Sequence, residues 1–596
     1  MALPHRRGYG STDEHSLPET DGFIETDLRA GGPWLHDFLC AKYTILPKSS
    51  PYKALWRDGG AISSQLEDLC RAQNHRVGSA IFWGRRSVYE PDAEPTTTLA
   101  VSLMGRREDD PPYACTRIDL ARMLWRDLCG RGLEGITVEV ADVSVIRRIE
   151  IYPCLPTDDI YPVWTEVAME IFDGIDRAGV FTIGCFRIGG SGWDRDESPS
   201  TVLIGVDRHS RRDWKDVRET VVSILDGRGL DSVVVTIRKD NMIARGVLSM
   251  DYDPGARAAD FRPDPRPGMS LGPCSEHGVY REGKLGGWVE VKNPHSEAWV
   301  PFALTCSRCC FPEESTLSEA DTEVIRGWKD GGVHQGDAHR DRLLQVDSPS
   351  DQGIEKGLET IADVIAQVKR RLDYFEAEKQ NEKDEDMSRR IERWLEESWK
   401  TLTDLQNKQS KIKNLRNSKS HHLGTVFASS GERQAPSTSD PKHLSLSIRD
   451  WALVQPTVPR RAGTNMVEHT IFPNEDQQLI HLLPEPPDMD EKLYTPAAHG
   501  VYGNLKTCHI TTKIENGRAV EAPTFEHVVV RCKARVQGEE TLDEPGSFIY
   551  ESAGLIKGMV FGGSGSGDLG YFTGTKDLLD DIEHITGAEV RLLYVD

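Results

Sequence analysis

Two stretches near the C-terminus decide the fold: Asp543–Phe548 reads Asp-Glu-Pro-Gly-Ser-Phe, and Gly558–Gly563 reads Gly-Met-Val-Phe-Gly-Gly. A Pro-Gly pair by itself indicates a turn. Apolar residues follow it up to Gly563, which favours a turn leading into buried strands. Pro545 carries neither a hydroxyl nor a backbone N–H, so this position can supply neither group to a reaction.

Four further stretches extend this pattern. Gly570–Thr573 reads Gly-Tyr-Phe-Thr and precedes the helical pattern of Asp577–Ile585. Arg449–Val454 reads Arg-Asp-Trp-Ala-Leu-Val. Leu285–Val289 and Phe302–Cys310 read Leu-Gly-Gly-Trp-Val and Phe-Ala-Leu-Thr-Cys-Ser-Arg-Cys-Cys.

In this order, the stretches resemble the conserved strands of trypsin-like serine proteases. In that family the first strands end in Leu-Thr-x-x-His, a later strand reads Asp-aliphatic-Ala-Leu, and the nucleophile segment reads Gly-Asp-Ser-Gly. The likeness is strongest to the divergent trypsin-like domains of fungal multidomain proteins. The resemblance implies an all-β chymotrypsin-like double barrel over about residues 271–596.

The resemblance also assigns the positions of the catalytic triad. The family's histidine falls on Arg308, its aspartate on Asp450, and its serine on Pro545, 95 residues after Asp450. Asp450 is therefore retained. Arginine stays protonated at working pH and cannot act as a general base. Proline removes both the nucleophile and one of the two oxyanion donors.

Two roles remain open for the retained aspartate: it forms an ion pair with Arg308, or it caps backbone amides while Arg308 faces solvent.

A triad reassembled from neighbouring groups would require them to meet within about 0.5 Å of productive geometry. Counting back from Pro545 places Glu539 at the base of a specificity pocket, which would favour a basic side chain. The neighbours considered for a reassembled triad are Ser307, Cys309, His421, His422 and Ser547.

The N-terminal region contains a duplication. Thr98–Leu103 parallels Thr201–Val206, and Arg-Gly-Leu at 131–133 recurs at 228–230, 97 residues later. Helical and strand periodicities predict an α-β-β-α-β pattern twice, in units of about 55–150 and 155–250. We expect one α+β layer with its helices on one face. Its ligand is not evident.

Residues 350–416 form a helical insertion in the barrel domain. Ile354, Leu358, Ile361, Ile365 and Val368 begin a seam spaced alternately by four and three residues, which is a heptad pattern. A polar run at 379–386 separates it from a second helical pattern. The segment predicts an antiparallel hairpin or, alternatively, one long helix that dimerises.

The remaining boundaries follow from composition. Residues 1–50 are expected to be a disordered arm, 51–250 the duplicated domain, 251–270 a proline-rich linker and 271–596 the barrel domain, in an α+β multidomain chain.

The charge of −23 argues against nucleic acid or anionic membrane as a partner. Without an apolar leader or span, we expect an intracellular, cytoplasmic protein, with the nucleus not excluded. The twelve cysteines suggest no disulfide framework.

These residues favour a catalytically inactive trypsin-like homologue that binds proteins or peptides, or acts as a scaffold. An active serine endopeptidase with an atypical or misread catalytic segment is the first alternative. A coiled-coil assembly factor, self-associating through residues 354–416, is the second. No cofactor and no metal is expected, since Cys306, Cys309 and Cys310 lack a second half at zinc-finger spacing and fit buried thiols.

Overall fold

The computed structural model contains the predicted duplication in its N-terminal part. Each repeat runs helix, strand, strand, helix, strand, and in each the second strand pairs antiparallel with the first and parallel with the third. The first repeat comprises α3 (Gly60–Ala72), β3 (Arg76–Ser87), β4 (Thr96–Met104), α4 (Arg117–Gly130) and β5 (Thr137–Asp142). The second comprises α6 (Trp164–Gly174), β7 (Val180–Gly189), β8 (Ser200–Asp207), α7 (Lys215–Gly227) and β9 (Val234–Asp240).

The structure describes part of the 596-residue chain. Most of the predicted arm, residues 251–264 of the predicted linker, and Glu539 lie outside the described ranges. These ranges are 29–30, 41–46, 49–58, 60–87, 94–105, 110–142, 150–189, 194–207, 210, 212–240, 242–243, 265–274, 282–293, 295–381, 384–438, 445–457, 460, 463–465, 491–495, 499–515, 518–531, 544–552, 554–565 and 567–593.

The repeated Arg-Gly-Leu ends a helix in the same way in both copies. Gly132 and Gly229 have φ of +77° and +71°, a left-handed conformation that glycine adopts without a Cβ penalty. In each copy the leucine N–H bonds back to a carbonyl five residues earlier, Leu133 to Leu128 at 3.0 Å and Leu230 to Leu225 at 2.9 Å. This hydrogen bond closes the helix C-terminus and turns the chain into the third strand.

The two repeats lie in different sheets and have separate cores, so the expectation of one shared layer is wrong. The prediction that the helices cover one face of the sheet is confirmed within each copy. In each, one apolar cluster contains alternate residues of the strands together with the inward-facing residues of both helices. The first sheet has the order β1-β5-β4-β3-β2. It adds β1 (Arg29–Ala30) and β2 (Ala41–Thr44), and α2 (Lys53–Asp58) precedes the repeat.

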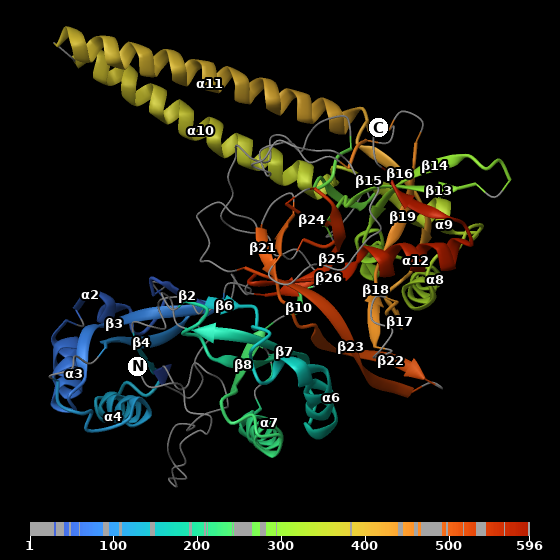
Figure 1. Ribbon diagram of the computed structural model, residues 1–596. Helices are drawn as coiled ribbons and strands as arrows, with labels where there is room; N and C mark the ends of the chain where they lie inside the picture. The colour runs from blue at the N-terminus through green and yellow to red at the C-terminus, as the bar shows by residue number, and fades with distance from the viewer. Residues whose placement is uncertain are drawn as a thin grey trace. The chain divides into compact units, whose positions relative to one another are not determined.

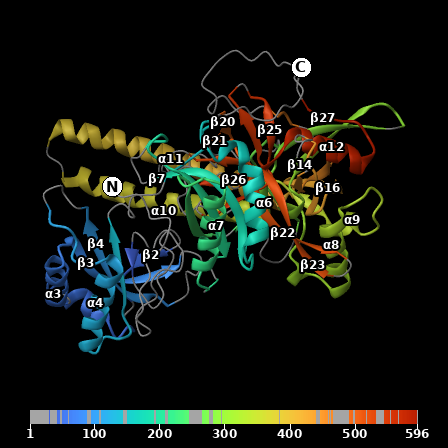
Figure 2. The same ribbon diagram turned by 60° about the horizontal axis from the view of Figure 1, so that its bottom comes forward.

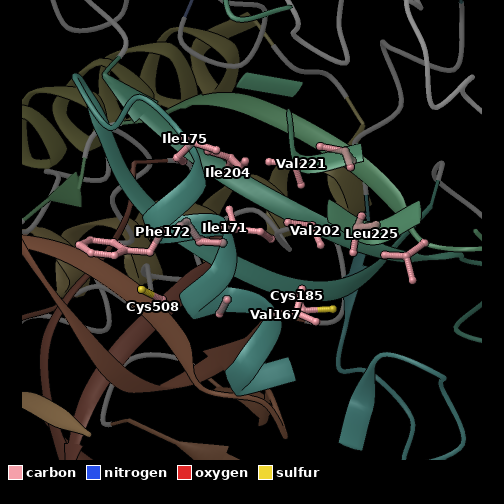
Figure 3. Packing of buried hydrophobic residues seen from close by; sticks show 14 of the residues in the cluster. Val167, Ile171, Phe172, Ile175, Cys185, Val202, Ile204, Val221, Leu225 and Cys508 are labelled. Atoms are coloured by element: carbon pink, nitrogen blue, oxygen red, sulfur yellow. The ribbon is translucent and has the colours of Figure 1, made fainter. Parts of the chain in front are cut away.

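The second sheet gains a hairpin from far along the chain. Cys508 and His509 pair antiparallel with Ile183 and Thr182 of β7, and Cys508 is buried in the second core (Figure 3). The sheet of the second repeat is therefore completed by residues about 300 positions downstream. The added strands are β6 (Glu150–Tyr152), before the one-turn η1 (Tyr161–Val163), with β22 (Thr507–Glu515) and β23 (Arg518–Val530).

The contacts divide the chain into two compact units. Unit 1 consists of residues 1–242, 503–534 and 564–569, and unit 2 of residues 243–502, 535–563 and 570–596. Unit 1 thus holds both repeats together with the β22–β23 hairpin. None of the helices in the described residues combines the length and apolar character that a membrane span requires.

Unit 2 is built around an antiparallel sheet of order β12-β11-β15-β16-β19-β14-β13-β27. Trp288, Val289, Ala303, Leu304, Leu453 and Val454 are buried on its strands. The strands are β11 (Ser270–Pro273), β12 (Gly283–Lys284), β13 (Gly287–Lys292), β14 (Trp299–Thr305), β15 (Gln345–Asp347), β16 (His422–Ser429), β19 (Ala452–Pro456) and β27 (Val590–Leu592).

Further antiparallel strands and short helices complete unit 2. Strand β24 pairs with β20 and β25, and β25 with β26, while β17 pairs with β18. Their bounds, with the short β10 at the junction of the units, are β10 (Met242–Ile243), η3 (Ser307–Cys309), η4 (Glu314–Thr316), α8 (Glu319–Gly331), α9 (Arg340–Leu343), β17 (Arg433–Pro436), β18 (Leu446–Arg449), β20 (Lys492–Tyr494), β21 (His499–Tyr502), β24 (Phe548–Glu551), β25 (Ile556–Ser564), β26 (Leu569–Gly574) and α12 (Thr575–Thr586).

The insertion between β15 and β16 is an antiparallel helical hairpin. Helices α10 (Asp351–Asn381) and α11 (Glu385–Asn417) lie side by side in Figures 1 and 2. The predicted seam of α10 packs on Leu402 and Ile412 of α11 in one apolar cluster. The heptad face is thus filled within the chain, which confirms the hairpin over the single long helix.

Candidate functional site

The sheet register of unit 2 brings together Arg308 and Asp450, the first two positions that the resemblance assigns to a triad. Strands β14 and β19 are antiparallel, with Thr305 opposite Ala452. The residues that follow Thr305 and those that precede Ala452 therefore lie at the same end of the sheet. Arg308 lies in the single turn of η3 directly after β14, and Asp450 lies between β18 and β19.

Arg308 and Asp450 form a buried ion pair between Nε and Oδ2. Asp450 also accepts a hydrogen bond through Oδ1 from the backbone N–H of Arg308 at 3.2 Å. The residues are 6% and 2% exposed, so Arg308 does not face solvent. Of the two roles left open by the sequence, the ion pair is present, and the carboxylate caps a backbone amide as well.

The surroundings keep Arg308 charged. Burial by itself lowers the pKa of Arg308, but the carboxylates of Asp450 and Glu432 outweigh it and raise this pKa above its ordinary value. The guanidinium can therefore neither accept nor release a proton at physiological pH. A permanent cation occupies the position where the family resemblance expects a proton carrier.

The segment of the third triad position meets the same corner. The carbonyl oxygen of Pro545 accepts a hydrogen bond from the N–H of Lys284 at 2.8 Å and lies 3.9 Å from Cys309 Sγ. Gly546 has φ of +93°, and its N–H bonds to the carbonyl of Val560 at 2.8 Å. The Arg308, Asp450 and Pro545 segments thus converge, although 95 residues separate Asp450 from Pro545.

The neighbouring polar groups do not rebuild a catalytic triad. Ser547 is fully buried, and Ser307 donates its hydroxyl to the carbonyl of Trp451 at 2.6 Å. His421 and His422 contact Asp347, and within the described residues no contact joins either of them to Asp450. Within the described residues, none of the neighbours considered for a triad therefore places an imidazole beside Asp450.

Cys306, Cys309 and Cys310 are buried thiols, as the sequence suggested. Each lies against a carbonyl oxygen: Cys306 with Val560 at 3.2 Å, Cys309 with Pro545, and Cys310 with Cys306 at 3.7 Å. Burial raises the pKa of Cys306 and of Cys310 well above the ordinary value. The thiols of Cys306 and Cys310 therefore remain protonated and are poor nucleophiles.

A second charged network fixes the residues on either side of Asp450. The buried guanidinium of Arg449 lies 3.7 Å from Asp577 Oδ1 and 3.8 Å from Asp581 Oδ1, both on α12. Trp451 donates its indole N–H to Asp581 at 2.7 Å. The residues on both sides of Asp450 are thus held by one helix, which positions the carboxylate.

The sequence did not single out the group of side chains around Asp347 at the base of the hairpin. The available signal is the adjacent pair His421–His422 after a helix, which the sequence relates only to a substitute base for Asp450. Cys274 and Asp347 are distant in sequence and meet them through strand pairing. This group is Cys274, Asp347, Asp351, His421 and His422.

Searches with this chain matched none of the protein-family models, curated proteins or solved structures compared.

Replacing Asp450 with Asn is expected to reduce the free energy of unfolding of unit 2 by about 3–5 kcal/mol, because Arg308 keeps its charge and loses the carboxylate paired with it. Chemical denaturation followed by tryptophan fluorescence measures this change. The double variant Arg308→Met/Asp450→Leu is the control. It removes both charges and should lie close to the wild type. Equal stability of Asp450→Asn and the wild type would contradict a stabilising ion pair.

Asp577 gives a pH-dependent prediction. Burial opposes its ionisation, but Arg449 and hydrogen bonds from Ser437 and Thr438 outweigh this and lower the pKa of Asp577 to about 2. Because the folded pKa lies below the unfolded value, the stabilisation is complete above about pH 4 and is lost as the pH falls toward 2. The shift corresponds to about 2 kcal/mol.

The Asp577→Asn variant should therefore lose less stability than the wild type between pH 4 and pH 2. Thermal unfolding midpoints measured at several pH values across this window test the expectation. Parallel midpoint curves for the two proteins would show that Asp577 does not carry this pH dependence.

Proposed function

We propose that unit 2 is a catalytically inactive relative of trypsin-like proteases and that the chain acts as a protein- or peptide-binding scaffold. The observation that carries the proposal is the buried Arg308–Asp450 ion pair beside the Pro545 turn. The three segments follow the family's order His, Asp, Ser in sequence and converge at one end of an antiparallel sheet. This convergence supports a chymotrypsin-like arrangement of unit 2.

The chemistry of the corner supports inactivity. Acyl transfer by this class of enzyme needs a hydroxyl nucleophile, an imidazole and two oxyanion donors. Arg308 supplies a fixed positive charge, and Pro545 has no hydroxyl and no N–H. The N–H of the next residue, Gly546, is already bonded to Val560, so it cannot serve as a substitute oxyanion donor. The fold itself depends on packing and not on the triad, so it can outlast the loss of activity.

The hairpin supports a binding role. Tyr374 of α10 and Trp394 of α11 are 59% and 38% exposed, and both rings contact Phe375 at centroid distances of 5.7 and 5.4 Å. We call these three residues the aromatic patch. Exposed aromatic clusters are enriched where proteins bind other proteins. The patch lies on a hairpin whose own apolar seam is already filled, which leaves it free for another chain.

The full-length protein should neither cleave a mixed peptide library nor react with a fluorophosphonate probe, because both reactions require an activated serine. Mass spectrometry of the probe-treated protein provides the readout, with trypsin as the positive control. Labelling of Ser547, or cleavage that the probe blocks, would establish the active-endopeptidase alternative.

Peptides selected from a displayed random library should bind the wild-type protein at least about 10-fold more tightly than the Trp394→Ala variant, since truncating an aromatic hot spot costs about 2 kcal/mol or more. Fluorescence anisotropy of the labelled peptides measures the affinities. The matched control is Trp399→Ala, which removes an exposed tryptophan of α11 outside the aromatic patch. Equal affinities for the wild type and Trp394→Ala would exclude the patch as the binding surface.

A further inference from the structure

Five side chains able to bind a metal ion meet where the helical hairpin joins the sheet of unit 2. Cys274 directly follows β11, Asp347 ends β15, and Asp351 begins α10, while His421 and His422 follow α11 and begin β16. The ligand atoms of Cys274, Asp347 and His422 all lie within 4.8 Å of one another, and so do those of Asp347, Asp351 and His421. Asp347 belongs to both sets, so we call the group the Asp347 cluster.

Backbone hydrogen bonds fix the positions of these residues. The N–H of Cys274 bonds to the carbonyl of Gln345 at 2.7 Å, and the N–H of Ser348 bonds to the carbonyl of His421 at 2.9 Å. Asp347 faces His422 across an irregularity in the β15–β16 register. Asp347 and His422 are therefore held by strand pairing, and Cys274 by a backbone hydrogen bond directly after its strand, which favours a preformed metal site.

The distances between the candidate ligand atoms fit a bound ion. Two nitrogen or oxygen ligands of a tetrahedral zinc ion, each bonded at about 2.0–2.1 Å, lie about 3.3 Å apart. His422 Nδ1 lies 2.9 Å from Asp347 Oδ1, and His421 Nε2 lies 3.6 Å from Asp347 Oδ2 and 3.5 Å from Asp351 Oδ1. Small side-chain movements would bring the ligand atoms of Cys274, Asp347 and His422 to bonding geometry around one ion.

The environment of Asp347 matches the support that metal-binding carboxylates receive. Asp347 is 2% exposed and His421 is 5% exposed. Nδ1 of His421 faces the carbonyl of Leu415 at 3.4 Å, and its Nε2 faces both carboxylates. His421 thus faces the second oxygen of Asp347, and Asp351 in turn faces His421. Partners of this kind orient a ligand and are commonly as important as the ligand itself.

We propose that the Asp347 cluster binds one zinc ion through Cys274 Sγ, Asp347 Oδ1 and His422 Nδ1. Thiolate, imidazole and carboxylate together form a donor set that suits zinc, whereas calcium and magnesium take oxygen ligands. Cys274 is exposed and His422 half-buried, so the fourth coordination position is open to water. This site is independent of the Arg308–Asp450 corner.

The bound ion would have a structural consequence. Its ligands come from the ends of β11 and β15 and from the start of β16, on both sides of the inserted hairpin. Zinc would therefore tie the two points where the hairpin leaves and re-enters the sheet. Since an ion that binds only the folded chain stabilises it, zinc should raise the unfolding temperature of unit 2.

The test uses the full-length protein, stripped with a chelator and then supplied with zinc chloride. Elemental mass spectrometry after dialysis should find one zinc per chain, and competition with a chromogenic chelator gives the affinity. Cys274→Ser should weaken zinc binding at least about 10-fold, given that even the loss of a supporting residue costs about 10- to 100-fold. Cys129→Ser is the matched control, because this thiol is also partly exposed and lies outside the cluster.

Cobalt provides a readout specific to the assigned ligands. The cobalt-loaded protein should show a thiolate-to-cobalt charge-transfer band that Cys274→Ser abolishes and Cys129→Ser retains. Because Cys274 lies at the surface, its substitution should leave the circular dichroism unchanged. Failure of the wild type to retain zinc would overturn the proposal. So would zinc binding that Cys274→Ser leaves intact, including binding lost only in His421→Gln.

Discussion

The burial of one guanidinium constrains the whole corner of unit 2. A charge that cannot be neutralised by losing a proton can be buried only beside an opposite charge. Arg308 therefore requires the carboxylate of Asp450, and the register of β14 and β19 requires the two residues to face each other. Once position 308 carries arginine, an acidic residue at position 450 has a structural reason to be present that is separate from any catalytic one.

The Pro545–Gly546 turn shows a similar separation of structure from chemistry. A Cβ on Gly546 would lie 2.2 Å from the carbonyl oxygen of Lys284 and 2.6 Å from Thr305 Oγ1, and the residue has a left-handed φ. Only glycine satisfies both conditions. At the preceding position, the contact that fixes the turn is made by the backbone, because the carbonyl oxygen of Pro545 accepts the hydrogen bond from Lys284. Packing thus requires glycine at position 546, whereas only a catalytic reaction would require a hydroxyl at position 545.

The sequence predicted those features that depend on local periodicity. The two α-β-β-α-β repeats and the hairpin followed from the spacing of apolar residues, since that spacing reports directly which face is buried. It could not predict that Cys508 enters the core of the second repeat, because pairing between β22 and β7 leaves no local signal in either strand. The expectation of one shared layer failed for the same reason: periodicity identifies the buried face of a strand but not its neighbour.

The Arg308–Asp450 corner and the Asp347 cluster differ in the origin of their positive charge, and the sequence revealed only the first of them. Beside Asp450 the cation is a guanidinium, attached to the chain and visible as an unexpected residue in a familiar pattern. Beside Asp347 the carboxylate oxygens face two imidazoles, which carry a positive charge only when protonated, and a thiol, which has none. A bound metal ion would supply the missing positive charge. The first cluster is therefore complete in the folded chain under all ordinary conditions. The second depends on what the solution supplies, which is the property that separates a ligand site from a structural ion pair.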